Sequence, residues 1–144
     1  MYFCDEHRGI TRYYEILKSS VCEKYQLRQM EYDILMFLHN NPQYNTAADI
    51  VKVRKSTKSH VSTSLKSLEN KGLIERIQSE DNKKHITIVL LEKAELIVQE
   101  GIYAQKQFAH NVLSGLTEEE KHMCIKVFHK ICNNAEEHLR EKEQ

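Results

Sequence analysis

One segment of this 144-residue chain, residues 55–76, restricts its fold more than any other part of the sequence. Its apolar side chains Val61, Leu65 and Leu68 recur at helical spacing, so the segment is predicted to form a helix with one narrow face against a core. Gly72 is suited to end that helix, and the residues after it are typical of a β-strand. We therefore expect a helix that ends at a glycine and leads directly into a β-hairpin.

The opposite face of the predicted helix is polar. It carries Ser59, Thr63, Lys66 and Asn70, and hydroxyl, amide and ammonium groups pair well with base edges and phosphates in a DNA groove. The chain has no net charge, but residues 52–76 contain seven Lys or Arg against two acids, a local charge of +5 that the other residues balance. Basic side chains alone are also typical of an ordinary solvated surface. Together with the polar helix face, however, they indicate contact with nucleic acid.

Neighbouring segments complete a helix-turn-helix with a wing. Upstream of the polar helix, Thr46 and Asp49 have the spacing of a capping box, and Ser56 or Thr57 is predicted to cap the polar helix itself. Two short helices joined by a tight turn form a helix-turn-helix. Downstream, two β-like runs flank a charged loop and predict a hairpin wing. These runs are residues 73–78 and 85–91.

Long helices are predicted on both sides of this unit. Apolar residues recur at helical spacing in residues 6–24, 28–40 and 92–113, and again downstream of Thr117, which is the expected N-cap of the last helix. A chain of this size offers the terminal helices little to pack against. We therefore expect a homodimer in which the N- and C-terminal helices of two subunits interleave, with packing inside one protomer as the alternative.

The predicted fold is mainly α with a small β-hairpin wing: a winged helix-turn-helix with long N- and C-terminal dimerisation helices. Residues 1–27 would form the N-terminal dimerisation helix and residues 28–91 the DNA-binding lobe. Residues 92–144 would form the C-terminal dimerisation helices of the same protomer.

Other function classes are not supported by the sequence. No apolar run is long enough to cross a bilayer, no export leader opens the chain, and the four cysteines form no CxxC pair, which together predict a cytoplasmic protein with free thiols. The sequence contains no glycine-rich phosphate loop, no nucleophile motif and no isolated carboxylate pair. We therefore expect neither an enzyme nor a bound metal or cofactor.

Three groups of residues carry a family resemblance: Lys58-Ser59-x-Val61-Ser62, then Leu68-Glu69-x-Lys71-Gly72-Leu73-Ile74-Glu75-Arg76, and Leu91-Glu92-Lys93 after the hairpin. With the order of the helices, they resemble the MarR family of bacterial transcriptional regulators. The hairpin departs from the family pattern, because Asn82 and Lys84 stand where the family usually has Asp-x-Arg. Lys keeps the positive charge but lacks the planar donors of Arg, so weaker or less shape-selective minor-groove contacts are expected.

The resemblance implies a transcriptional regulator, more often a repressor, that binds a pseudo-palindromic site in double-stranded DNA as a homodimer. It also implies release or modulation by a small aromatic or phenolic effector. Tyr13, Tyr14 and Tyr32 are our candidates for lining that effector's pocket, and ordinary core packing is the alternative for them. The candidates for DNA contact are Lys55, Thr57, Lys58, Ser59, His60, Ser62, Thr63, Lys66, Arg76, Asn82, Lys83 and Lys84.

Three alternatives stay open. Cys4 is spaced like the peroxide-sensing cysteine of organic hydroperoxide resistance regulators, although Gln29 replaces a tyrosine of those sensors; an inert thiol is the other interpretation. Two Cys/His pairs have metal-ligand spacing, but eight histidines make such pairs unsurprising. A winged helix that binds protein would expose apolar or acidic residues on its outer helix face, whereas this one exposes Lys and hydroxyls.

Overall fold

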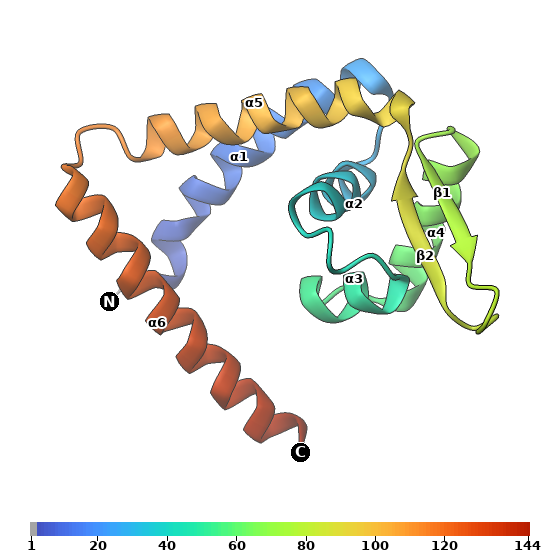
Figure 1. Ribbon diagram of the computed structural model, residues 1–144. Coiled ribbons are helices and arrows are strands. Elements are labelled where there is room, and N and C mark those ends of the chain that lie inside the picture. Colours follow the sequence, from blue (N-terminus) through green and yellow to red (C-terminus); the bar gives the residue numbers. More distant parts are fainter. Residues whose placement is uncertain (1–2) are drawn as a thin grey trace. The chain divides into compact units, whose positions relative to one another are not determined.

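The computed structural model describes residues 3–144, with side chains from residue 5 onward (Figure 1). Two compact units are present, one ending at Phe108 and one formed by Ala109–Gln144. The elements in chain order are α1 (Phe3–Tyr25), α2 (Gln29–Asn40), α3 (Ala47–Arg54), α4 (Lys58–Asn70), β1 (Ile74–Gln78), β2 (Ile86–Leu90), a 3-10 turn (Glu92–Ala94), α5 (Glu95–Val112) and α6 (Glu118–Glu143). The predicted class, mainly α with a small antiparallel hairpin, is confirmed.

Side-chain caps begin three of the helices at the predicted residues. The Thr46 hydroxyl accepts the Asp49 N–H at 3.1 Å, and the Asp49 carboxylate accepts the Thr46 N–H at 3.2 Å. Of the two candidates before α4, Thr57 is the N-cap, and its hydroxyl accepts the His60 N–H at 3.2 Å. Thr117 caps α6 through a further capping box. These caps satisfy backbone N–H groups that have no partner inside their helix.

The core of the first unit surrounds α2, in which seven of the twelve residues are buried. The predicted stripe of α4 packs there, with Val61 and Leu65 each 1% exposed and Leu68 fully buried. The hairpin contributes Ile74 and Ile88 to the same core, and α5 contributes Ile97. The stripe therefore turns the opposite face of α4 away from the protein.

A glycine allows α5 to pass close to α2. A Cβ atom placed on Gly101 would lie 2.3 Å from the Met36 sulfur and 3.2 Å from the Tyr32 hydroxyl oxygen. Helix α1 runs antiparallel to α5, because Tyr25 near its end bonds Glu100 and Tyr14 near its middle contacts Phe108 (Figure 1). The two long helices of this unit thus contact each other along their length.

Two ion-paired acids join elements that are distant in sequence. Glu31 on α2 is 1% exposed, and its carboxylate accepts a hydrogen bond of 2.7 Å from Lys71 at the end of α4. Asp33 on α2 accepts 3.0 Å bonds from Lys18 of α1 and from Arg54 at the end of α3. Asp33 therefore connects the first helix of the chain with the helix-turn-helix.

The second unit exposes its apolar side chains. Within residues 109–144, α6 has no buried residue. The large apolar side chains exposed along it are Met123, Ile125, Val127, Phe128, Ile131 and Leu139. No helix in residues 3–144 is long and apolar enough to cross a membrane.

Candidate nucleic-acid interface

A tight turn joins α3 to α4, the candidate recognition helix. Lys55 ends α3 in the left-handed conformation, with φ 52° and ψ 41°. The following N–H, that of Ser56, donates to the Val51 carbonyl at 3.1 Å. This tight connection leads directly to the Thr57 cap, so α4 starts immediately after the turn.

Every predicted contact residue on the turn and on α4 is exposed. These residues are Lys55, Thr57, Lys58, Ser59, His60, Ser62, Thr63 and Lys66. Among residues 3–144, neither Lys58 nor Lys66 forms an ion pair. The face therefore offers exposed hydroxyls and at least two cations, Lys58 and Lys66, that no acid of residues 3–144 neutralises.

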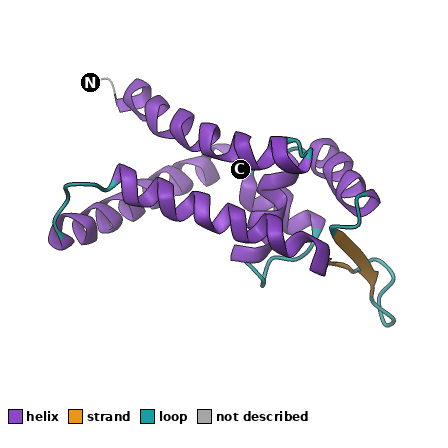
Figure 2. Cartoon of the chain, turned by 90° about the horizontal axis from the view of Figure 1, so that it is seen from above, coloured by secondary structure: helices purple, strands orange, loops and turns teal. Residues whose placement is uncertain are grey.

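The hairpin lies beside α4 (Figure 1), and its tip projects from the neighbouring helices (Figure 2). Lys83 and Lys84 lie exposed at its tip. The Asn82 side chain accepts the Lys84 N–H at 3.1 Å, and its carbonyl accepts the His85 N–H at 2.9 Å. Asn82 therefore folds the tip through an Asx-type turn, a structural role that the motif comparison did not anticipate.

Backbone hydrogen bonds fix the base of the hairpin. Gly72, with φ +71°, ends α4, and the Leu73 N–H donates to the Leu68 carbonyl at 3.0 Å. Leu91 donates to the Leu73 carbonyl at 3.0 Å. Ile88 of β2 donates to Asn45 at 2.8 Å, which attaches the hairpin to the loop before α3. The hairpin thus starts from a defined position relative to the helix-turn-helix.

Arg76 lies in a different environment from the lysines of the tip. Its Nε donates to the Glu69 carboxylate at the end of α4. This hydrogen bond lowers the pKa of the Glu69 carboxyl below its usual value. Sequence reasoning did not identify Glu69 as its partner, although the two residues are close in sequence.

The three tyrosines proposed for an effector pocket lie together. The Tyr32 ring is 1% exposed, and its hydroxyl is 3.4 Å from that of Tyr14. The Lys18 ammonium lies 5.2 and 5.9 Å from the Tyr14 and Tyr32 ring centroids, and Phe108 packs on Tyr13 and Tyr14. Burial, with the hydrogen bond to Tyr14, raises the pKa of Tyr32, so its phenol stays protonated at neutral pH. Tyr32 therefore belongs to the core, while Tyr13 and Tyr14 are half-buried beside it.

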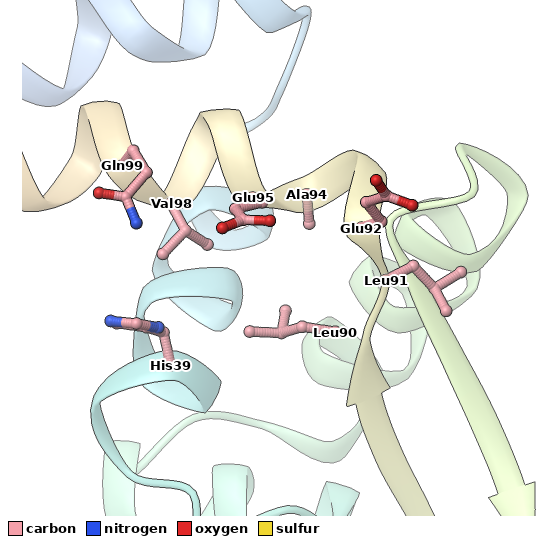
Figure 3. Close-up of a pocket in the computed structure, with 8 residues that line it drawn as sticks. All are labelled: His39, Leu90, Leu91, Glu92, Ala94, Glu95, Val98 and Gln99. Atoms are coloured by element: carbon pink, nitrogen blue, oxygen red, sulfur yellow. The ribbon is translucent and has the colours of Figure 1, made fainter.

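A cavity of about 250 Å³ lies elsewhere, between the end of α2 and the start of α5 (Figure 3). Its apolar surface comes from Leu90, Ala94 and Val98, while His39 and Glu95 supply polar groups. None of these residues was a sequence candidate. His39 lies on α2 and the other four lie within residues 90–98, so no local sequence signal connects His39 with them.

A cysteine sensor and a metal site were the remaining alternatives. The Cys4 side chain lies outside the described residues. Cys22 is buried, and burial raises the pKa of its thiol, which makes the reactive thiolate scarcer. Among the described residues, no group of three or more His, Cys, Asp or Glu side chains is arranged to hold a metal ion.

Comparison with known proteins identifies the fold. A family model described as MarR family matches residues 25–85. A MarR protein from Peptoclostridium difficile is similar over 96% of this chain and 90% of its own, with a TM-score of 0.82 and 16% identity. A MarR-family regulator from Listeria monocytogenes complexed with a 26mer DNA has a TM-score of 0.75 and 24% identity over 88% of this chain and 86% of its own. The S. aureus MepR–DNA complex has a TM-score of 0.71 and 21% identity over 93% of each chain.

No curated protein matches the sequence. The family match covers the helix-turn-helix and most of the hairpin, where the sequence motifs and the caps of α3 and α4 also lie. The similar structures extend the same fold over most of the chain. Residues 25–85 thus match the MarR family in sequence, and the described chain has the fold of solved MarR-family structures.

Proposed function

We propose that this protein is a transcriptional regulator that binds double-stranded DNA, with α4 in the major groove and the hairpin tip at the neighbouring minor groove. The observation that carries the proposal is the division of α4 into two faces. Val61, Leu65 and Leu68 are fully buried, whereas the opposite face exposes Thr63 and Lys66 beside further hydroxyls and cations. Such a surface suits base edges and phosphates better than it suits an apolar protein partner.

The start of α4 adds a phosphate site to this surface. Lys58 is the first residue of the helix and is exposed. A helix N-terminus presents free N–H groups and a partial positive charge, both of which favour an anion. Two family members with this fold are described in complex with DNA. That finding supports the same role for α4 in this chain.

We further propose that the protein acts as a homodimer. The apolar side chains of α6 have no cover within residues 109–144, and Phe128 is 60% exposed. A second copy would bury them, with residues 1–27 and 92–144 as the dimerisation regions and residues 28–91 as the DNA-binding lobe. Two lobes related by a two-fold axis would place their α4 helices about one helical turn apart, roughly 34 Å, on a pseudo-palindromic operator.

Repression and effector release are the remaining parts of the proposal. A repressor that a small aromatic or phenolic ligand dislodges from DNA is consistent with the family. The candidate residues for contacting this ligand are Tyr13, Tyr14 and Tyr32. Because they pack with one another and with Phe108, a ligand could enter only if the cluster opened. A thiol sensor that uses Cys4 is the second candidate for regulation and predicts an effect of organic hydroperoxide on DNA affinity.

The test is a mobility-shift titration with DNA from upstream of the protein's own gene. We expect a specific complex whose affinity falls steeply with salt, because lysines on α4 and the wing displace counterions. A Lys58→Ala/Lys66→Ala variant should lose the complex, whereas Lys106→Ala on α5 should keep it. DNA binding by the double variant at wild-type affinity would contradict the assignment of this face.

A further inference from the structure

Arg76 lies on the proposed DNA-binding side of the protein, but its guanidinium forms an ion pair with another residue of the same chain. Its Nε lies 2.5 Å from a Glu69 carboxylate oxygen, and this ion pair joins β1 to the last turn of α4. The two side chains are 35% and 42% exposed, so the pair lies at the surface. It therefore connects the two elements that would enter adjacent grooves.

The register of the hairpin explains why Arg76 reaches α4. Arg76 pairs with Ile88, which is 4% exposed and belongs to the core. Successive side chains on a strand point to opposite faces, so Arg76 shares the inner face with Ile74, while Glu75 and Ile77 point outward. The Arg76 side chain consequently lies beside the helix, unlike those of Lys83 and Lys84 at the tip.

A cavity lined mainly by α3 and α4 reaches the hairpin at Arg76. Lys58, Ser62 and Glu69 share one flank of α4 by helical spacing. Lys58 and Ser62 line a cavity of about 350 Å³ together with Arg76. Arg76 reaches from β1 to α4 beside this cavity, so its ion pair with Glu69 is a direct restraint on the hairpin above its hydrogen-bonded base.

We propose that Arg76 is a positioning residue, which with Glu69 sets the angle between the hairpin and α4. This inference rests on the proposed DNA-binding function. If the guanidinium moved to a phosphate, it would leave the Glu69 carboxylate unpaired beside the negatively charged duplex, which is unfavourable. Held on Glu69, it keeps the tip lysines and α4 at the separation needed to reach neighbouring grooves together.

The first arm of the test uses the full-length protein without DNA. Hydrogen exchange of the β1–β2 amides should quicken in Glu69→Gln and in Arg76→Gln, by up to about fivefold for a partly exposed ion pair. The double variant should show no further increase. The charge-reversed protein, Glu69→Arg/Arg76→Glu, should return towards the wild-type rate. Unchanged exchange in both single variants would overturn the proposal, whatever the DNA result.

The second arm measures affinity for upstream DNA at several salt concentrations. Both single variants should bind several-fold more weakly with an unchanged salt slope, and charge reversal should restore binding. Lys84→Gln is the matched control, because a tip lysine on phosphate should lower the slope by about 0.9 and leave hairpin exchange unaltered. The contrary result would be a similar fall in the salt slope for Arg76→Gln together with normal DNA binding by Glu69→Gln. It would show that Arg76 contacts a phosphate and would contradict the inference.

The two arms separate this inference from the proposed function. If the wild-type protein forms no specific DNA complex while hairpin exchange depends on the pair as expected, DNA binding is the claim that fails. In that case Arg76 has no positioning role in DNA recognition either. What remains supported is that the Glu69–Arg76 ion pair restrains the hairpin. If the wild type binds and exchange is unaffected, the positioning role alone fails.

Discussion

Gly101 shows how one residue sets the spacing between two helices. Replacing it with Ala would place a methyl group 2.3 Å from the Met36 sulfur, so α5 or Met36 must move. We expect Gly101→Ala to lower the free energy of unfolding by about 1–3 kcal/mol in urea denaturation, as overpacked cores do. Gly9→Ala is the control, because a Cβ at Gly9 meets nothing within 4 Å and Ala favours an exposed helix. Equal stability of the two variants would show that α2 and α5 do not pack closely.

Variants at Thr63 and Lys84 should distinguish base reading from phosphate binding, if these residues contact DNA as proposed. Both are exposed, one on α4 and one at the hairpin tip. Thr63→Ala should relax preference at one base pair, by about 1–3 kcal/mol of discrimination, with little change in salt slope. Lys84→Ala should weaken binding to all sequences and reduce the slope by about 0.9. Competition binding with single-base operator variants at two salt concentrations measures both, and identical profiles for the two variants would refute the distinction.

The Glu31–Lys71 pair makes the attachment of α2 to α4 dependent on pH. Burial acts to raise the pKa of Glu31, but hydrogen bonds from Lys71, Ser67 and the Arg28 backbone outweigh it and lower the pKa. A carboxyl with a lowered pKa stabilises the fold above its unfolded pKa, about 4.3, and that contribution is lost as the pH falls towards the folded value. The unfolding free energy should therefore fall less between pH 7 and pH 4 in Glu31→Gln than in the wild type.

Removing Lys71, the partner of Glu31, should destabilise the fold most at neutral pH and less at acid pH. Lys71→Met leaves a buried carboxylate without its ammonium partner and is expected to cost about 2 kcal/mol at pH 7. The deficit should shrink at acid pH, where Glu31 can become neutral. Lys121→Met is the matched control, since Lys121 pairs with the exposed Glu118, and it should change stability little. Urea denaturation of both variants at pH 7 and pH 5 tests this, and a deficit that grows towards pH 5 would contradict it.

Sequence reasoning succeeded for elements whose determinants are local. The Thr46 and Thr117 caps, the buried stripe ending at Leu68 and the glycine at the end of α4 all follow from residues within a few positions of one another. The strands and α5 differ from expectation only at their ends, and α5 begins after a 3-10 turn. Hydrogen bonding and helical periodicity act over such short distances, so they can be read from one segment.

Contacts between distant segments were not predictable in the same way. Glu31 and Lys71 are ordinary charged residues in the sequence, and only the packing of α2 on α4 brings them together. The same holds for Asp33, which joins α1 and α3, and for the cavity beside His39. In the candidate interface, the exposed residues of α4 followed from its periodicity. The pairing of Arg76 required the register of the hairpin, which the strand pattern left undetermined.

For the whole molecule, the apolar surface of α6 connects fold and function. Phe128 and Ile131 are 60% and 41% exposed, and a helix with such a surface gains free energy when another apolar surface covers it. If the cover is a second copy, the dimer determines the spacing of the two α4 helices. DNA affinity should then depend on residues of α6 that never touch DNA.

Phe128→Glu tests this dependence. A charge in an apolar interface should dissociate the dimer in sedimentation equilibrium, because a carboxylate would have to be buried without a partner. Operator affinity should fall together with the dimer fraction, since one lobe contacts only half of the site. Val89→Glu on the outer face of the hairpin is the control, as it also replaces an exposed apolar residue and should leave the dimer intact. If the Phe128→Glu protein still sedimented as a dimer, Phe128 would not lie in the dimer interface, and the proposal that a second copy covers this face of α6 would be wrong.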